Sequence, residues 1–414
     1  MDRLLGPVRP PFTLPWTAGG ARCAKLGADR SPDRVWEGRY VRRVGRGAGF
    51  RLAVGAALLG LVTGVAGCTG GSAGGTTGGA KEPSGGGSSN GSGATAPAAA
   101  PTGPGGGAGA LPQLPGQTFY VSDQTAAARQ VVALRGQSRT AEADTLLRIA
   151  AQPSSQWLGD QAARGIVEQV SRRAAEADRT PVFVAYNIPH RDCGLYSAGG
   201  ATDAAAYRAW ITGLGEALGD RRAWVVLEPD AVAHTLDACG VKGPAATERY
   251  ALLAFAVQEL KKRPQLRVYL DAGNPGWAQD PSALAEALRR SGIAAADGFA
   301  VNVSNFYTTD RNEAYGAQLS ALLDGKHFVV DTSRNGNGPL GSEAWCNPPG
   351  RALGAAPTAA TGRPGVDAYL WIKNPGESDG ECGRGEPRAG EFWLPYALGL
   401  AGGGSPGGAG TAAG

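Results

Sequence analysis

The stretch Trp224-Val225-Val226-Leu227-Glu228-Pro229-Asp230 decides how the rest of the chain is understood. Its apolar half predicts a fully buried strand of the kind found in parallel sheets. Proline removes a ladder donor and turns the chain out of the sheet, so both acids fall at the carboxyl end of the strand. Ligands of α/β folds bind at that end. The two acids are therefore either part of a catalytic site or the N-cap of a helix, a position that Asp favours.

Length and composition allow one large domain with extensions, or two domains. The chain has 414 residues, and its 66 Gly and 28 Pro gather in segments that predict linkers. The net charge is +4, but residues 1–51 carry eleven basic against four acidic side chains, so the remainder has a net charge of −3. This slightly acidic remainder of the chain gives no reason to expect a nucleic-acid partner. With no CxxC motif and only three histidines, we expect no metal site and no cofactor.

The first 112 residues predict an export signal and a tether. Residues 1–67 are expected to be an unstructured leader with a signal peptide, because a basic patch precedes the apolar run 52–66, which is too short to span a bilayer. Small residues before Cys68 resemble a bacterial lipoprotein processing box, in which Cys68 would be lipidated. The alternatives are an ordinary signal peptide and a plain membrane anchor. Residues 68–112 predict a Gly/Ser/Thr/Pro-rich linker, and residues 402–414 a flexible tail.

Strands and helices alternate along the body, which we place at residues 113–401. The predicted strands cover residues 181–187, 224–227, 266–270, 298–303, 327–330 and 369–372. The predicted helices cover residues 204–218, 246–262, 281–291 and 312–323. Short loops join these units, so we expect an α/β fold with a mostly parallel sheet, closed or nearly closed.

Nearly every predicted strand ends in a polar or acidic cluster. On one face of a barrel these clusters would form an acid-lined pocket with Arg191, Arg334 and Lys373 as counter-charges. Aromatic residues accompany them: Trp157, Tyr186, Trp277, Trp345, Trp371 and Trp393. Core packing is the expected role of Trp224 and Trp371. Acids with aromatic platforms suit glycoside hydrolysis, in which one carboxylic acid protonates the leaving oxygen and one carboxylate activates water or attacks the sugar.

These motifs, in their order along the chain, resemble glycoside hydrolase family 6, whose cellulases cleave β-1,4-glucosidic bonds with inversion. The resemblance covers nearly all of residues 114–401. It rests on the segments 152–160, 186–193, 227–230, 270–273, 331–336 and 373–380. It implies a distorted, partly open TIM-like β/α barrel with mostly parallel strands and an active-site cleft at their carboxyl ends.

The resemblance also implies roles for individual residues. Asp230 matches the general acid, Asp192 the carboxylate that raises the pKa of that acid, and Asp379 the base, with Arg334 as the charge partner of the base. Tyr186 matches the tyrosine that crowds the sugar at the cleavage point. Substrate contacts are implied for Trp157, Asp271, Asn274, Trp277, Lys373 and Glu377. The implied disulfides join Cys193 with Cys239 and Cys346 with Cys382, which agrees with export.

Two positions depart from the family pattern. Asn274 stands where the family usually has histidine, and Ala198 where some members have a serine that relays water.

All three acids are present, so we expect an active endo-β-1,4-glucanase that acts on cellulose or a related β-glucan. We expect it to be monomeric and to work outside the cell, with membrane contact only through a lipid anchor. The alternatives are a non-catalytic β-glucan-binding lipoprotein and a family 6 hydrolase with shifted polysaccharide specificity. The open cleft and endo action are expected because only about thirty residues separate Pro339 from Tyr369.

Overall fold

The computed structural model describes residues 116–159, 163–237, 239, 241–277, 280–341 and 345–403. The expectations for the leader, the linker, Cys68 and the tail beyond residue 403 lie outside these residues. In the described part of the chain, no helix combines the length and the apolar character needed to cross a membrane.

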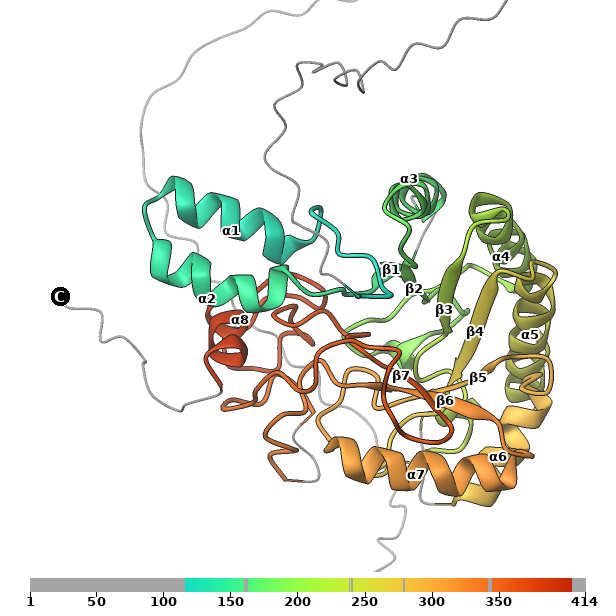
Figure 1. The fold of residues 1–414 in the computed structure, drawn as a ribbon. Helices are drawn as coiled ribbons and strands as arrows, with labels where there is room; N and C mark the ends of the chain where they lie inside the picture. Colours follow the sequence, from blue (N-terminus) through green and yellow to red (C-terminus); the bar gives the residue numbers. More distant parts are fainter. Residues whose placement is uncertain are drawn as a thin grey trace, which may run out of the picture. The chain divides into compact units, whose positions relative to one another are not determined.

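Within the described residues, seven strands form one sheet in which every pairing is parallel and spatial order follows sequence order. The strands are β1 (Gln156–Leu158), β2 (Val182–Ala185), β3 (Ala223–Leu227), β4 (Leu266–Asp271), β5 (Gly298–Val301), β6 (His327–Asp331) and β7 (Val366–Leu370). Helices α3 (Ala163–Glu176), α4 (Ala204–Leu218), α5 (Gly243–Lys261), α6 (Pro281–Arg290) and α7 (Thr309–Leu322) follow one another around the outside of the sheet (Figure 1). The expected β/α barrel is confirmed.

Residue alternation along the strands explains how the sheet is covered on both sides. In β3, Val225 and Leu227 pack with the outer helices, whereas Trp224 and Val226 belong to a second apolar cluster inside the curved sheet. Both sets are buried, so the strand is apolar at every position, as a parallel strand covered on two faces must be. The predicted core position of Trp224 is confirmed.

The barrel is open between β1 and β7. In the described residues no strand ladder joins these two edges. Single hydrogen bonds connect them instead: the backbone N–H of Ser155 donates to the carbonyl of Trp371 at 3.1 Å, and the indole N–H of Trp157 donates to the carbonyl of Ile372 at 2.8 Å. The edges therefore approach each other without pairing, which leaves room for a cleft.

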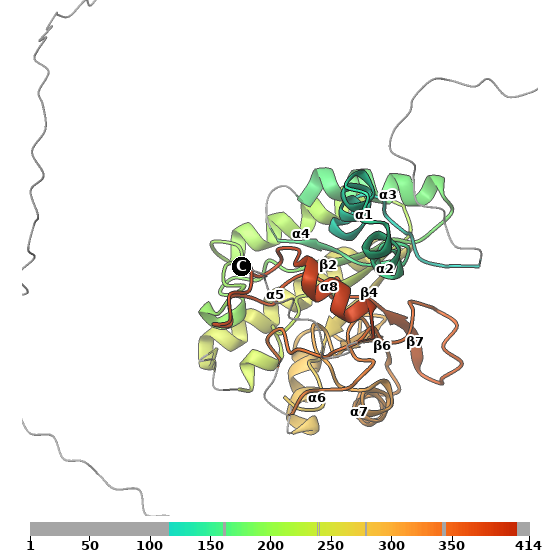
Figure 2. The ribbon, with the colours of Figure 1, turned by 90° about the vertical axis from the view of Figure 1, so that its left-hand side faces the viewer.

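A second helical layer packs against the segment that follows β7. Helices α1 (Ala126–Gly136), α2 (Thr140–Ala150) and α8 (Leu394–Ala401) form their own buried cluster, which includes Trp371 (Figures 1 and 2). The expected burial of Trp371 is confirmed. These three helices, α3 and the three-residue β1 are absent from the sequence-based assignment. β1 is too short to show a periodic pattern, whereas α2 and α3 were missed although they are amphipathic.

Three predicted strands end earlier than expected. The strand assigned to residues 181–187 stops at Ala185. The strand assigned to residues 298–303 stops at Val301, because Asn302 has a left-handed backbone with a φ of 68°. The strand assigned to residues 369–372 is β7 at residues 366–370. Beyond it, the N–H groups of Ile372 and Lys373 donate to the carboxylate of Asp331 and not to a ladder. The end of β5 is therefore set by the backbone of Asn302, and the end of β7 by the carboxylate of Asp331.

Candidate active site

A buried carboxylate after β3 holds the end of β2. Glu228 is fully buried and has a φ of 51°. Its carboxylate accepts hydrogen bonds from the backbone N–H of Asn187, at 2.9 and 3.1 Å, and from that of Ile188 at 2.9 Å. Burial raises the pKa of Glu228 to about 7, and these donors oppose the rise. Glu228 therefore fastens two neighbouring strand ends together and leaves Asp230 as the acid that faces outward.

Asp271 and Asp331 act in the same way. Asp271, at the end of β4, accepts hydrogen bonds from the backbone N–H of Asp230 at 2.9 Å and of Gly273 at 3.1 Å. Asp331, at the end of β6, accepts from four backbone N–H groups: Ser304, Ser333, Ile372 and Lys373. Both carboxylates are buried. Asp271 was expected to contact the substrate, but it lies beneath the cleft and holds the loop that carries Asp230.

Asp230 is presented by a strained turn. It follows Pro229, has a φ of 71°, and its side chain lines the cleft. Burial, and then the nearby charges of Asp271, Asp192 and Asp237, raise the pKa of Asp230 well above its ordinary value. A raised pKa favours the protonated form of this carboxyl group, which is the form that a general acid requires.

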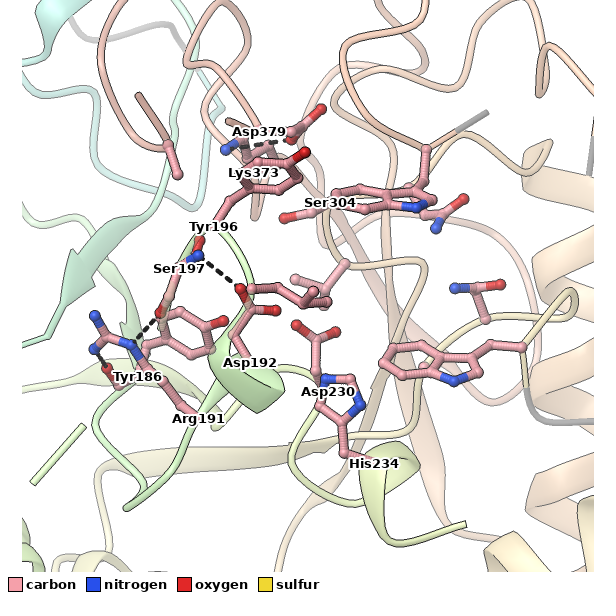
Figure 3. Close-up of a pocket in the computed structure, with 18 of the residues that line it drawn as sticks. Tyr186, Arg191, Asp192, Tyr196, Ser197, Asp230, His234, Ser304, Lys373 and Asp379 are labelled. Carbon is pink, nitrogen blue, oxygen red and sulfur yellow. Dashed lines mark hydrogen bonds and ion pairs between the residues drawn. The ribbon is translucent and has the colours of Figure 1, made fainter. Parts of the chain in front are cut away.

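Asp192 reaches the same space from the loop after β2. It begins the short 3₁₀ helix η1 (Asp192–Gly194), has a φ of 54°, and accepts a hydrogen bond from the backbone N–H of Ser197 at 2.6 Å (Figure 3). Burial raises the pKa of Asp192. A disulfide from Cys193 to Cys239 ties this loop to the segment after β3, as the family pattern implied.

Asp379 has the opposite electrostatic surroundings. The guanidinium of Arg334 donates to both carboxylate oxygens, at 2.8 and 3.0 Å, the ammonium of Lys373 lies 3.5 Å away, and the backbone N–H of Asn347 donates at 3.0 Å. Burial alone would raise the pKa of Asp379, but the charges of Arg334 and Lys373 outweigh it and lower the pKa below its ordinary value. This carboxylate stays ionised.

The cleft has a volume of about 710 Å³. Most of the side chains predicted for the site line it: Trp157, Tyr186, Asp192, Asp230, Asn274, Trp277, Lys373, Glu377 and Asp379. Arg334 does not line it, because its side chain is fully buried behind Asp379 and packs over the ring of Phe306. One opening therefore brings together a carboxyl group with a raised pKa, Asp230, and one with a lowered pKa, Asp379, from strand ends far apart in the sequence (Figure 3).

Aromatic side chains border the cleft. Trp157 packs edge-on against Tyr186, with ring centroids 5.2 Å apart. The indole N–H of Trp277 donates to Asp237 at 3.0 Å, which fixes the orientation of its ring. Trp345 is 44% exposed, one of the highest exposures of a large apolar side chain in the described residues. Ordered rings with a free face provide stacking surfaces for sugar rings.

The two departures from the family pattern have different structural settings. Asn274 is buried, and its side-chain oxygen accepts a hydrogen bond from the backbone N–H of Gly276 at 3.0 Å, so it stabilises the turn that leads to Trp277. Ala198 lines the cleft next to Ser197. The backbone N–H of Ser197, and not a side-chain hydroxyl, is the group that contacts Asp192.

Sequence reasoning missed several residues of the cleft wall. His234, Asp237 and Tyr196 line the cleft but were not assigned to it. Ser304 and Asn305 also line it, and they belong to the polar cluster expected after the strand at residues 298–303. Tyr196 and Trp345 approach each other from separate loops, with ring centroids 6.1 Å apart. His234 and Asp237 follow shortly after the Glu-Pro-Asp turn, which is a local signal that could have indicated them. The place of Tyr196 depends on loop positions that follow from the tertiary structure.

The fold and the cleft define a class: a β/α-barrel hydrolase of glycosidic bonds, with paired acids at the carboxyl ends of parallel strands and aromatic platforms beside them. Residues 114–403 match the model of glycosyl hydrolases family 6. The chain belongs to that family.

Relatives and solved structures agree with this assignment. The chain is 40% identical over 291 residues to endoglucanase A of Cellulomonas fimi, an alignment that covers 69% of this chain and 61% of that protein. It is 42% identical over 287 residues to endoglucanase 1 of Streptomyces halstedii, covering 67% and 86%. The structure of the endoglucanase Cel6 from Mycobacterium tuberculosis, in complex with a thio-linked methyl cellobiosyl cellobioside, matches with a TM-score of 0.64 and 45% identity, covering 70% of this chain and 98% of that one.

Proposed function

We propose that this protein is an endo-β-1,4-glucanase that cleaves internal bonds of cellulose or a related β-glucan with inversion. The observation that carries the proposal is the contrast between Asp230, whose pKa is raised, and Asp379, whose pKa is lowered, in one cleft. Aromatic borders suit a polymeric sugar, and the relatives named endoglucanase support endo action.

In the proposed reaction, Asp230 donates its proton to the glycosidic oxygen as the bond to the anomeric carbon breaks. A water molecule forms the new bond at that carbon from the opposite face, and its proton passes to Asp379, which thereby becomes neutral. Asp192 keeps negative charge near Asp230 and so favours its protonated form. Arg334 holds Asp379 ionised and in place.

Further side chains are proposed to bind the sugar chain. Trp157 and Trp277 provide stacking surfaces, Tyr186 crowds the ring at the cleavage point, and Lys373 and Glu377 hydrogen-bond hydroxyl groups. Asn274 contributes by holding the Trp277 turn.

The test is Asp230→Asn assayed by reducing-sugar release from carboxymethylcellulose. Loss of the proton donor should lower turnover by about 10²- to 10⁴-fold, while binding of cellotetraose, measured by calorimetry, persists. A dinitrophenyl cellooligosaccharide needs no protonation of its leaving group, so its cleavage should fall far less. Turnover of carboxymethylcellulose close to that of the wild type would overturn the assignment, and binding without any release by the wild type would indicate a binding protein.

We also propose that the protein is exported and held at the outer face of the membrane through Cys68, with residues 68–112 as a tether to a monomeric catalytic domain at 113–401 and a short tail at 402–414. The two disulfides support an oxidising compartment, and the family match at residues 114–403 supports the domain limits. Mass spectrometry of the mature N-terminus tests this: a diacylated Cys68 is expected, and cleavage elsewhere would refute the anchor.

A further inference from the structure

A histidine and an aspartate form a pair at the floor of the cleft that the proposed mechanism does not use. His234 lies in the short 3₁₀ helix η2 (Ala233–Thr235), and its Nδ1 lies 2.9 Å from the carboxylate of Asp237. The same carboxylate also accepts the indole N–H of Trp277. The imidazole is 6% exposed and its ring packs edge-on against Trp277 at 4.8 Å. Its orientation is therefore held from two sides.

The other ring nitrogen has no partner. Nε2 of His234 is buried and makes no hydrogen bond with the described residues. Since the Asp237 carboxylate can only accept, Nδ1 carries a proton, and Nε2 is the ring atom left to bind a ligand. A buried polar atom left without a partner destabilises the fold, so a ligand that binds it would remove that cost. This geometry leaves a ready ligand atom beside the acids of the cleft.

Two carboxylates surround that region. The ligand atoms that Asp192, Asp230 and His234 offer all lie within 4.8 Å of one another, and Figure 3 shows the imidazole directly beside the carboxylate of Asp230. Metal–ligand bonds of about 2.0–2.1 Å place the ligand atoms of a tetrahedral site about 3.3 Å apart. The three side chains would have to close by at most about 1.5 Å.

The hydrogen bond from His234 to Asp237 is the arrangement that metal-binding histidines use. Such a histidine almost always donates its second N–H to a carboxylate or carbonyl, which fixes the tautomer and raises the basicity of the ligating nitrogen. A second cluster, Cys193, His234 and Cys239, offers no comparable site because both sulfurs are joined in a disulfide. One imidazole and two carboxylates suit a first-row transition metal, since imidazole favours zinc, copper, iron and nickel.

We propose that Asp192, Asp230 and Nε2 of His234 form a binding site for a divalent transition-metal cation, with Asp237 as the outer partner of the histidine. The expectation of no metal site rested on short-range motifs, and these residues come from two different loops. Because the cation would occupy oxygens of Asp192 and Asp230, it would inhibit and not assist the reaction. This last consequence rests on the proposed function, whereas the binding does not.

The binding test is calorimetric titration of Zn²⁺ into the wild type, His234→Gln, and the matched control His327→Gln. His327 also pairs with an aspartate, Asp367, through Nδ1 at 2.8 Å, but it is exposed and belongs to no cluster of metal ligands in the described residues. Cys23 and Cys68 are common to all three proteins, so any thiol binding adds the same background.

We expect one Zn²⁺ site that is weakened at least about 10- to 100-fold in His234→Gln and unchanged in His327→Gln. Asp237→Asn should weaken it by about 10- to 100-fold, the usual loss when the outer partner of a ligand is removed. Equal affinity in the wild type and His234→Gln, or no saturable site in the wild type, would overturn the proposal.

An activity measurement separates the two proposals. If both hold, Zn²⁺ lowers carboxymethylcellulose cleavage by the wild type, EDTA restores it, and the cation concentration needed is higher for His234→Gln by the factor measured in the titration. Zinc bound as expected with no glucanase activity in metal-free protein would refute the proposed function alone. Inhibition with the same concentration dependence in both proteins would refute the metal site alone.

Discussion

Replacing Arg334 with methionine tests the electrostatic arrangement of the cleft. The guanidinium is fully buried and bonds both oxygens of Asp379, which is also buried. Methionine fills a similar volume but leaves the carboxylate without its principal counter-charge. Breaking a buried ion pair by removing one partner costs about 3–5 kcal/mol. Lys373, at 3.5 Å from the same carboxylate, should keep the loss toward the lower end.

That loss converts into a measurable shift of the melting temperature. The matched domain of residues 114–403 has an unfolding entropy of about 0.6 kcal/mol/K, at roughly 2.1 cal/mol/K per residue. A loss of about 3–5 kcal/mol therefore lowers the melting temperature by roughly 5–8 °C in calorimetry. The control is Arg172→Met, whose partner Glu176 lies 3.5 Å away in an exposed pair, and there we expect little or no change.

The pH dependence has a definite sign. In the wild type, the pKa of Asp379 is lower in the folded than in the unfolded protein, where it is about 3.9, so the ionised carboxylate stabilises the fold above about pH 3.9. This stabilisation is lost as the pH falls through the pKa of the folded protein. In Arg334→Met, mainly Lys373 is left to oppose the effect of burial on Asp379, so the charged form of that carboxylate is disfavoured. The loss of stability relative to the wild type therefore grows as the pH rises from about 4. Melting at pH 5 should therefore show a smaller deficit than melting at pH 8.

A double-mutant cycle decides whether the pair is responsible. Arg334→Met with Asp379→Asn removes both charges, so its loss should be smaller than the sum of the two single losses. Strict additivity would refute the reasoning, as would a deficit for Arg334→Met no larger than that of Arg172→Met or one that does not change between pH 5 and pH 8.

Three further predictions concern two other acids at the strand ends and the second disulfide. Asp192→Asn removes a charge that raises the pKa of Asp230, so the alkaline limb of the pH profile of kcat/KM should move to lower pH. An alkaline limb that stays in place would contradict the electrostatic coupling of Asp192 and Asp230. In the wild type, the pKa of Glu228 is raised to about 7, so the free energy of unfolding falls as the pH rises from about 4.5 to 7. Glu228→Gln should remove up to about 3 kcal/mol of this fall in urea unfolding measured across that range. An unchanged pH dependence would contradict the prediction. Replacing Cys346 and Cys382 together with serine opens a loop with a sequence separation of 36, which should cost about 4 kcal/mol in reversible unfolding, whereas a loss below 1 kcal/mol would show that the loop is held by other contacts.

Much of the barrel could be predicted because its signals are local. From the alternation of apolar strands with amphipathic helices, six strands were predicted, and five of them contain the core of an observed strand. The predicted helix at residues 204–218 has the same first and last residue as α4. The glycine- and proline-rich segments and the Glu-Pro-Asp turn are equally local. Helices α1, α2 and α8 were not predicted; in the fold their apolar faces pack together with Trp371.

The sequence by itself determined which residues stand at the strand ends, since a strand stops where proline or a polar run interrupts it, and it determined the family through the order of those motifs. Only the tertiary structure decided what each acid does. Glu228, Asp271 and Asp331 carry the same carboxyl group as Asp230, but backbone N–H groups of neighbouring strands donate to their oxygens. Asp379 meets Arg334 across 45 positions of sequence. The role of a carboxylate depends on the donors and charges around it, and in a parallel barrel those come from other strands.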